Sequence, residues 1–155
     1  MNPIIKPATA SDAEDFLRVL VASFEQYRDT LDPPSGVFKE TPHSISQKIE
    51  AGGGYLAYDE SSIVGVVLYQ FYPEALYLGR LGVLQTHRGQ RIAHQLIAAV
   101  EQTALAHDLH SIQLGVRIDL KGNQRLFTSL GYEIISYDRH EGYSEITSVT
   151  MLKRL

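Results

Sequence analysis

The chain has 155 residues, of which 44% are hydrophobic and 21% charged, a composition typical of globular proteins rather than disordered ones. It contains no cysteine, which excludes a disulfide framework, a thiolate-bound metal site and a cysteine nucleophile. Its formal net charge is −4, and since a general nucleic-acid binder usually shows a basic face, we do not expect nucleic acid as a partner.

The sequence shows no feature that would place the protein in a membrane or divide it into parts. Residues 1–7 lack the apolar core of a signal peptide, and no apolar run approaches membrane-spanning length. No repeat or low-complexity linker interrupts the chain. We therefore expect a soluble, cytoplasmic protein with a single domain over residues 1–155.

The first half of the chain predicts a strand, two helices and then a block of strands. A short strand at residues 4–5 precedes a capping box at residues 11–14, which opens a helix. Apolar residues then recur at helical spacing, namely Phe16, Leu20, Phe24 and Tyr27. Residues 31–40 read as a loop, and a helix capped by Thr41-Pro42 ends at the glycines 52–54. Three strands follow, at residues 55–58, 63–71 and 75–84.

The second half predicts two further helices among strands. Helical spacing indicates a helix over residues 89–107, followed by a strand at 112–116. A short helix at 123–130 ends at Gly131, and strands at 132–137 and 146–152 close the chain. Helices interspersed with strands indicate a mixed α/β protein, and the early hairpin argues against an all-parallel, doubly wound sheet.

The most informative segment is residues 78–96, where a strand leads through a polar, glycine-containing turn directly into an amphipathic helix. The first turn of a helix carries unpaired N–H groups and the positive end of the helix dipole, so it is suited to bind a phosphate. Arg88 and Arg91 add positive charge at this place. The turn matches neither a P-loop nor a dinucleotide-binding fingerprint.

Two stretches resemble the GNAT superfamily of N-acetyltransferases. Residues 88–93, Arg-Gly-Gln-Arg-Ile-Ala, resemble its signature Arg/Gln-x-x-Gly-x-Gly/Ala and depart only at Arg91, where the family usually has glycine. Because a residue in a helical first turn has a negative φ, we expect a side chain to be tolerated there. Residues 123–132 resemble the family's Asn-x-x-Leu-Tyr-x-x-Leu-Gly-Phe/Tyr. The resemblance implies the GNAT acyltransferase fold, an α/β (α+β) architecture with a central mixed, mostly antiparallel sheet flanked by helices.

The resemblance also implies acetyl-CoA, or another acyl-CoA, as the donor in a direct transfer to an amine, with no metal. In the family, the backbone of the fourth strand pairs with the pantetheine arm, the pyrophosphate sits on the following turn, and an asparagine contacts the cofactor near its thioester. The cofactor-binding residues implied here are Leu81, Gly82, Val83, Arg88, Gly89, Gln90, Arg91, Ile92, Ala93, His94 and Asn123. His107 and His110 have no carboxylate cluster that would complete a metal site.

The residues that would carry the catalysis are less evident. Many family members use a tyrosine in the second motif as the proton donor to the leaving thiolate, and here that position is Phe127. His140 and Tyr143, in the turn between the last two strands, are candidate catalytic residues, or else surface turn residues. Tyr27 would line the acceptor side or continue the apolar stripe of the first helix. We expect Tyr77, like Tyr69 and Tyr72, to pack on the sheet.

Three functions are consistent with these observations. The first is an N-acetyltransferase that moves an acetyl group from acetyl-CoA to a primary amine of a small molecule or peptide, with net acidity favouring a cationic acceptor. The second, suggested by Phe127, is a non-catalytic acyl-CoA-binding module of the same fold. The third is a structural or interaction domain. An exposed sheet edge, or the strand at residues 146–152, could pair with another subunit as a homodimer.

Overall fold

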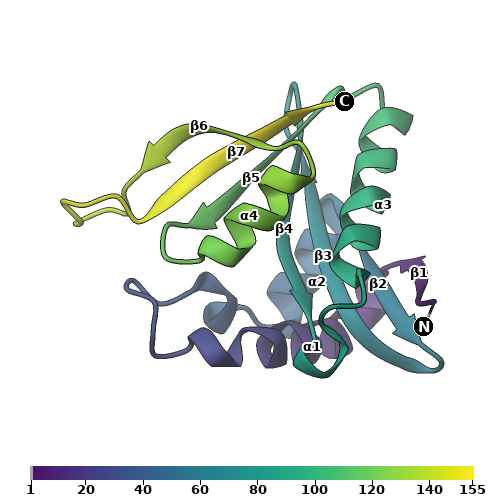
Figure 1. Cartoon of the computed structure of the whole chain (residues 1–155). Helices are drawn as coiled ribbons and strands as arrows, with labels where there is room; N and C mark the ends of the chain where they lie inside the picture. The colour runs from purple at the N-terminus through teal and green to yellow at the C-terminus, as the bar shows by residue number, and fades with distance from the viewer. Residues whose placement is uncertain (1) are drawn as a thin grey trace.

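The computed structural model describes residues 2–155, and its centre is one sheet of seven strands in the order β1-β2-β3-β4-β5-β7-β6 (Figure 1). Neighbouring strands are antiparallel except for the parallel pair β4 and β5. The predicted mixed, mostly antiparallel sheet is therefore confirmed. The strands are β1 (Ile4–Pro7), β2 (Gly53–Asp59), β3 (Ser62–Phe71), β4 (Leu76–Val83), β5 (Ser111–Arg117), β6 (Glu133–Asp138) and β7 (Ser148–Arg154).

Helices cover both faces of the sheet. In Figure 1, α3 and α4 lie in front of the sheet, whereas α1 and α2 lie behind it. Each face has its own hydrophobic core, because successive side chains of a strand point to opposite faces: Leu56 belongs to the core under α1 and α2, and Ala57 to the core under α3. The helices are α1 (Ala13–Phe24), α2 (Pro42–Ala51), α3 (Ile92–Ala106) and α4 (Lys121–Ser129).

The predicted order of elements is confirmed, but two helix starts differ from the prediction. The first helix is preceded by a 3-10 turn at Ala10–Asp12, and the backbone N–H of Thr9, not of Ser11, donates to the carboxylate of Asp12 at 2.7 Å. The third helix begins at Ile92 and not at residue 89, because Gly89 and Arg91 have φ values of 78° and 62°, outside the helical region.

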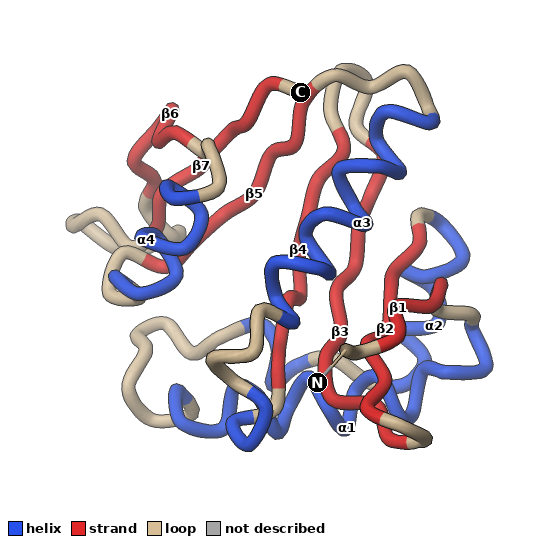
Figure 2. Tube along the Cα trace, turned by 45° about the vertical axis from the view of Figure 1, so that its right-hand side comes forward, coloured by secondary structure: helices blue, strands red, loops and turns tan. Residues whose placement is uncertain are grey.

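Strands β4 and β5 form a wedge. They pair only at Leu76 with Ile112 and at Tyr77 with Gln113, and beyond these two pairs they diverge (Figure 2). A bulge in β4 places two residues, Arg80 and Leu81, opposite the single residue Val67 of β3. Arg80 has a φ of 51°, and a bulge of this kind bends its strand. The open end of the wedge lies along the bulged part of β4.

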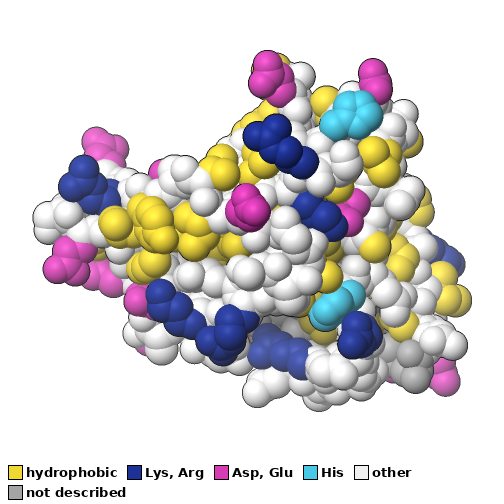
Figure 3. Space-filling model, turned by 45° about the horizontal axis from the view of Figure 1, so that its top comes forward, with side chains coloured by type: hydrophobic (Ala, Val, Ile, Leu, Met, Phe, Trp, Pro, Cys, Tyr) yellow, Lys and Arg dark blue, Asp and Glu magenta, His cyan; other side chains and the backbone are white. Residues whose placement is uncertain are grey.

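Strand β7 lies inside the sheet, between β5 and β6. The expectation that the C-terminal strand could offer an edge to another subunit is therefore wrong, since the free edges are β1 and β6. Strand β6 exposes Ile134, Ile135 and Tyr137, and hydrophobic side chains gather on this side of the molecule in Figure 3.

Candidate active site

The wedge between β4 and β5 opens into a cavity of about 620 Å³. On one face of the sheet it is lined by the end of α1 and the loop after it, including Tyr27 and Gly36. On the other face it is lined by the start of α3 and by α4, including Ala93, Asn123 and Phe127. The cavity therefore connects the two faces through the gap in the sheet.

The wall formed by β4 offers unpaired backbone to a ligand. Leu81, Gly82 and Val83 line the cavity, and β5 has left β4 before it reaches them. The carbonyl of Val83 accepts a hydrogen bond from Nε of Arg88 at 3.2 Å, while the rest of this edge has no strand partner on the β5 side. A Cβ on Gly82 would lie 2.1 Å from Oγ of Ser23, so only glycine lets α1 pack this closely on β4.

The turn before α3 is held in place by Arg88. Its guanidinium donates to the carbonyl of Val83, to Oε1 of Gln26 at 2.8 Å and to the carbonyl of Ser23 at 2.7 Å. This side chain therefore joins the ends of α1 and β4, and the charge that we expected to face a pyrophosphate is already bonded to protein oxygens. Arg91 is the N-cap of α3 in the left-handed region, so the expectation of a negative φ at this position is wrong.

The structure brings most of the predicted site residues to the cavity, but not all of them. The residues that line it are Tyr27, Leu81, Gly82, Val83, Arg88, Ala93, Asn123 and His140. The residues outside its lining are Gly89, Gln90, Arg91, Ile92, His94 and Tyr143. Gln90 and Arg91 are exposed on the turn, whereas the side chain of Ile92 is buried in the core. Lys and Arg side chains form a row along the lower margin of the face seen in Figure 3.

The two candidate catalytic residues have different surroundings. His140 lines the cavity, and its Nδ1 is hydrogen-bonded to Oγ1 of Thr147, which also accepts the backbone N–H of His140 at 2.9 Å. The hydroxyl of Tyr143 donates to the carboxylate of Asp32, and this hydrogen bond raises the pKa of Tyr143. Tyr143 therefore joins the β6–β7 turn to the loop after α1, while His140 faces the cavity.

Two aromatic residues define the interior of the wedge. Phe127, at the family's tyrosine position, is buried and packs edge-on against Tyr132 with 5.4 Å between ring centroids. Tyr77 stacks on Tyr72 as a packing residue, as expected, with 5.0 Å between centroids, but it also lines the cavity. Its hydroxyl lies 3.2 Å from the place a Cβ on Gly115 would take, and burial raises its pKa. No local sequence pattern indicates this second role.

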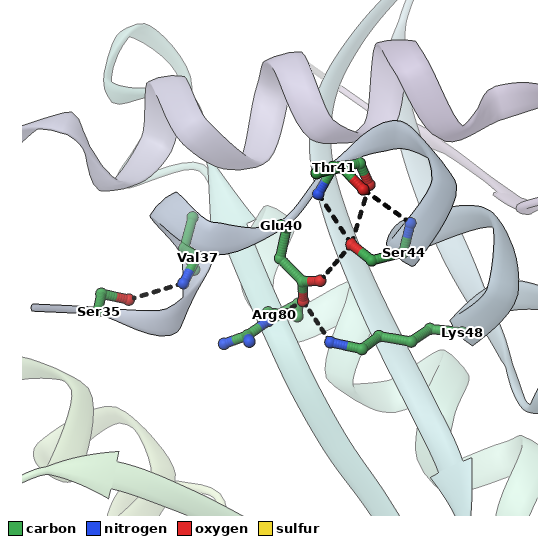
Figure 4. A network of polar contacts seen from close by, with 7 residues as sticks. All are labelled: Ser35, Val37, Glu40, Thr41, Ser44, Lys48 and Arg80. Carbon is green, nitrogen blue, oxygen red and sulfur yellow. Dashed lines mark hydrogen bonds and ion pairs between the residues drawn. The ribbon is translucent and has the colours of Figure 1, made fainter.

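Arg80 is a site residue that the sequence analysis missed. Figure 4 shows its Nε bonded to a carboxylate oxygen of Glu40, while its terminal nitrogens point away from that carboxylate. Glu40 also accepts from Nζ of Lys48 at 2.5 Å and from Oγ of Ser44 at 2.6 Å. Burial acts to raise the pKa of Glu40, but the hydrogen bonds from Lys48, Ser44 and Arg80 outweigh it, and the pKa lies below its usual value.

Arg117, at the end of β5, is a second residue that was missed. It lines the cavity, and its Nη2 donates to the carbonyl of Pro33 in the loop after α1. Its Nε is buried and has no hydrogen-bond partner among residues 2–155. Burial lowers the pKa of this guanidinium. Neither arginine belongs to a recognisable local motif, so only the tertiary structure shows that both reach the cavity.

Residues 2–155 contain no cluster of three or more His, Cys, Asp or Glu side chains suited to a metal ion. No helix among these residues has the length and hydropathy needed to cross a membrane.

Several solved structures share this architecture. The PaiA N-acetyltransferase from Thermoplasma acidophilum, in complex with coenzyme A, superposes with a TM-score of 0.83 at 14% identity, with 100% of both chains covered. The ribosomal-protein-S18-alanine N-acetyltransferase from Escherichia coli gives 0.78 at 13% identity, covering 99% of this chain and 94% of that one. A GNAT family acetyltransferase from Elizabethkingia anophelis with acetyl-CoA bound gives 0.71 at 19% identity, with 99% of both chains covered.

At this low identity the solved structures show only that the fold is shared. The family is identified by the sequence itself. No curated protein matches the chain. Residues 19–132, which run from the middle of α1 to the residue before β6 and include both stretches that resemble the superfamily, match the acetyltransferase (GNAT) family. The chain therefore belongs to the acetyltransferase (GNAT) family.

Proposed function

We propose that the protein is an acetyl-CoA-dependent N-acetyltransferase that acts on a primary amine of a small molecule or peptide. The observation that carries this proposal is the cavity that passes through the sheet between β4 and β5. A direct transfer requires the donor and the acceptor to meet, and a passage open to both faces lets each of them enter from its own side. Two of the similar structures contain coenzyme A or acetyl-CoA, which supports the same class of donor here.

The residues on the α3 and α4 face fit such a donor. The backbone of Leu81 to Val83 has no strand partner on the β5 side and can pair with the amide groups of a pantetheine arm. The first-turn N–H groups of α3, beside the cavity at Ala93, suit a pyrophosphate. Asn123 supplies an amide to the same cavity. The donor would therefore lie along β4 with its reactive end at the bulge.

The chemistry then needs two proton movements. The acceptor reaches the site as an ammonium and gives a proton to a base, and the free amine nitrogen attacks the thioester carbonyl carbon. As the new C–N bond forms, the C–S bond breaks, the nitrogen loses a second proton, and the departing sulfur takes up one proton. The products are the N-acetyl amine, the free thiol and one proton released to solvent. We assign the acceptance of a proton from the amine to His140, which lines the cavity from the β6–β7 turn.

The second candidate function is a non-catalytic acyl-CoA-binding module. The observation that favours it is Phe127, which has no proton to give and whose buried ring packs on Tyr132. Tyr77 lines the same cavity, and because burial raises its pKa, its hydroxyl is protonated at neutral pH and is our candidate donor to the sulfur. This residue makes turnover feasible without the family's tyrosine.

The test is thiol release from acetyl-CoA, followed with a thiol-reactive dye over a panel of amino acids, other amines, aminoglycosides and basic peptides. The protein contributes no background because it has no cysteine. We expect release that depends on one class of acceptor and equals the acetylated product found by mass spectrometry. If acetyl-CoA raises the melting temperature but no acceptor releases thiol, the binding module replaces the enzyme. If acetyl-CoA does not bind, both are wrong.

A further inference from the structure

The lining of the cavity has a charge opposite to that of the chain. The protein carries a net charge of −4, yet the lining contains Arg80, Arg88 and Arg117 and no Asp or Glu. A smaller cavity of about 240 Å³ shares Tyr77 to Arg80 with the large one, adds Lys48, and also has no carboxylate in its lining. The net charge would favour a cationic acceptor by steering, but the residues that would touch the acceptor favour an anionic group.

Arg80 keeps part of its hydrogen-bonding capacity free. Arg88 is already bonded to three protein oxygens, whereas Arg80 uses only Nε, for Glu40. Within residues 2–155 its two terminal nitrogens have no hydrogen-bond acceptor, and 31% of the side chain is exposed. Glu40 is shared between Arg80 and Lys48, so this cluster of two cations and one carboxylate keeps an excess positive charge.

Protein groups compensate the positive charge of Arg117 even less than that of Arg80. Its guanidinium has five N–H groups but only one acceptor among the described residues, the carbonyl of Pro33. The charges that face it are Asp32 and Asp119, which favour its charged form, yet no carboxylate of residues 2–155 lies within ion-pair distance of it. Asp32 is instead held by the hydroxyl of Tyr143. A partly buried cation with no carboxylate in direct contact is a suitable site for an incoming anion.

Both arginines are attached to the same segment, on the acceptor side of the sheet. Arg117 bonds to Pro33, and Arg80 bonds to Glu40 while its Nη2 lies 3.0 Å from the place that a Cβ on Gly36 would take. Residues 33–40 therefore hold the two guanidinium groups at the part of the cavity opposite to α3 and α4, which we assign to the donor.

We propose that Arg80 and Arg117 bind a carboxylate of the acceptor, so that the acceptor is a small amine of the amino-acid type. This inference rests on the proposed transferase function. The planar guanidinium groups match the geometry of a carboxylate, and partial burial strengthens the attraction. The cavity must hold the pantetheine arm as well, which favours a small acceptor.

The first experiment compares amines with and without the acceptor's negatively charged carboxylate. L-amino acids, their α-carboxamides, the corresponding decarboxylated amines and phosphoethanolamine are assayed by thiol release, with rates corrected for the fraction of free amine. We expect the kcat/KM of the amino acids to exceed that of the carboxamides by about 100-fold or more, because two charge-assisted contacts are lost in the amide. Turnover without this preference overturns the inference and leaves the transferase standing. A preference for phosphoethanolamine overturns the carboxylate assignment.

The second experiment assigns the preference to a residue. Arg117→Gln is expected to raise KM for the amino acid by about tenfold or more, while kcat/KM for the carboxamide and KM for acetyl-CoA change less than about twofold. The matched control is Arg18→Gln on the exposed surface of α1, where the arginine side chain is 62% exposed, and it should change neither value. An equal loss for acid and amide overturns the role of Arg117.

A binding measurement separates this inference from the proposed function. Calorimetric titration of the coenzyme A-loaded protein with the amino acid and with its carboxamide requires no turnover. We expect the acid to bind more tightly than the amide, and Arg117→Gln to weaken binding of the acid about tenfold or more. This result supports a carboxylate-binding site even if no acceptor is acetylated. If the acid and the amide bind equally, the inference is wrong whatever the activity.

Discussion

Nε of Arg80 lies 2.7 Å from Oε2 of Glu40, and the same oxygen accepts from Nζ of Lys48. Arg80 is the bulged residue of β4 with a φ of 51°, a conformation that costs a non-glycine residue about 1–2 kcal/mol. The carboxylate that binds it belongs to the loop before α2. A distant segment of the chain therefore holds the side chain of the residue at which β4 bends away from β5.

Replacing Glu40 by glutamine should weaken the fold and the site together. The carboxylate is only 4% exposed, and its loss leaves Arg80 and Lys48 repelling each other around a neutral amide. Because both cations are about one-third exposed, we expect a modest loss of about 1–3 kcal/mol in the free energy of unfolding. Chemical denaturation measures it. Glu50→Gln, on the exposed side of α2, is the control and should stay within about 0.5 kcal/mol.

The same carboxylate predicts a pH dependence of stability. The folded state lowers the pKa of Glu40 below its ordinary value of 4.5, so the folded state binds a proton there less readily than the unfolded chain. Its contribution is therefore present above about pH 4.5 and is lost as the pH falls through the folded pKa. Denaturation at pH 6, 5, 4 and 3 should show a steeper loss for the wild type than for Glu40→Gln. Parallel curves would contradict the lowered pKa.

Arg91→Gly should stabilise the protein. Arg91 is held at a φ of 62°, which glycine adopts without steric cost, although glycine also adds entropy to the unfolded chain. The balance predicts a gain of up to about 1 kcal/mol, measured as a rise in melting temperature. Its neighbour Gln90 is also exposed but has no positive φ, so Gln90→Gly should lower the melting temperature. A fall in both variants would be evidence against strain at Arg91.

Arg88→Ala should lower the free energy of unfolding, in addition to any loss of affinity for a ligand. Its guanidinium bonds to oxygens of Val83, Gln26 and Ser23, which joins β4 to the end of α1. We expect a loss of about 1–2 kcal/mol, seen by denaturation without any ligand. The control is Arg18→Ala, whose arginine pairs only with the exposed Asp15 and should contribute less than about 0.5 kcal/mol. Unchanged stability in Arg88→Ala would mean that this side chain serves the ligand alone.

His140 and Tyr143 should differ in their effects on turnover. His140→Ala removes the imidazole that lines the cavity, and we expect kcat to fall by about 100-fold with little change in KM for acetyl-CoA. Tyr143→Phe removes only the bond to Asp32, so kcat should fall less than about fivefold. Initial-rate kinetics with the identified acceptor measure both. Full activity in both variants would eliminate the β6–β7 turn from catalysis.

The order of elements was predictable from the sequence because hydrophobic spacing is a local signal. The stripe at Ile92, Leu96 and Val100 identified α3, and all three residues are buried in the core on that face of the sheet. The donor side that we propose lies next to the strand-to-helix turn that the sequence singled out. The start of α3 was misplaced because Arg91 takes a left-handed conformation that its residue type does not suggest.

The part of the cavity that we propose for the acceptor could not be predicted from local sequence patterns. Arg80 meets Glu40 across 40 positions, and Arg117 meets Pro33 across 84, so no window of the sequence contains either pair. The sequence predicts only the packing role of Tyr77, because its place in the cavity lining depends on how β4 and β5 are arranged in the whole sheet. Long-range contacts of this kind make up the part of the site that sequence reasoning missed.

The sheet consists of two halves whose strands are hydrogen-bonded to each other only at the two residue pairs between β4 and β5. Strands β1 to β4 form one half of the sheet and β5, β7 and β6 the other, and within each half every strand pairs with its neighbour over four or more residues. A ligand bound in the wedge contacts both halves, so it links them at the open end as well. A bound ligand should therefore slow amide hydrogen exchange in both halves of the sheet at once. On unfolding, the ligand must dissociate before the two halves can separate.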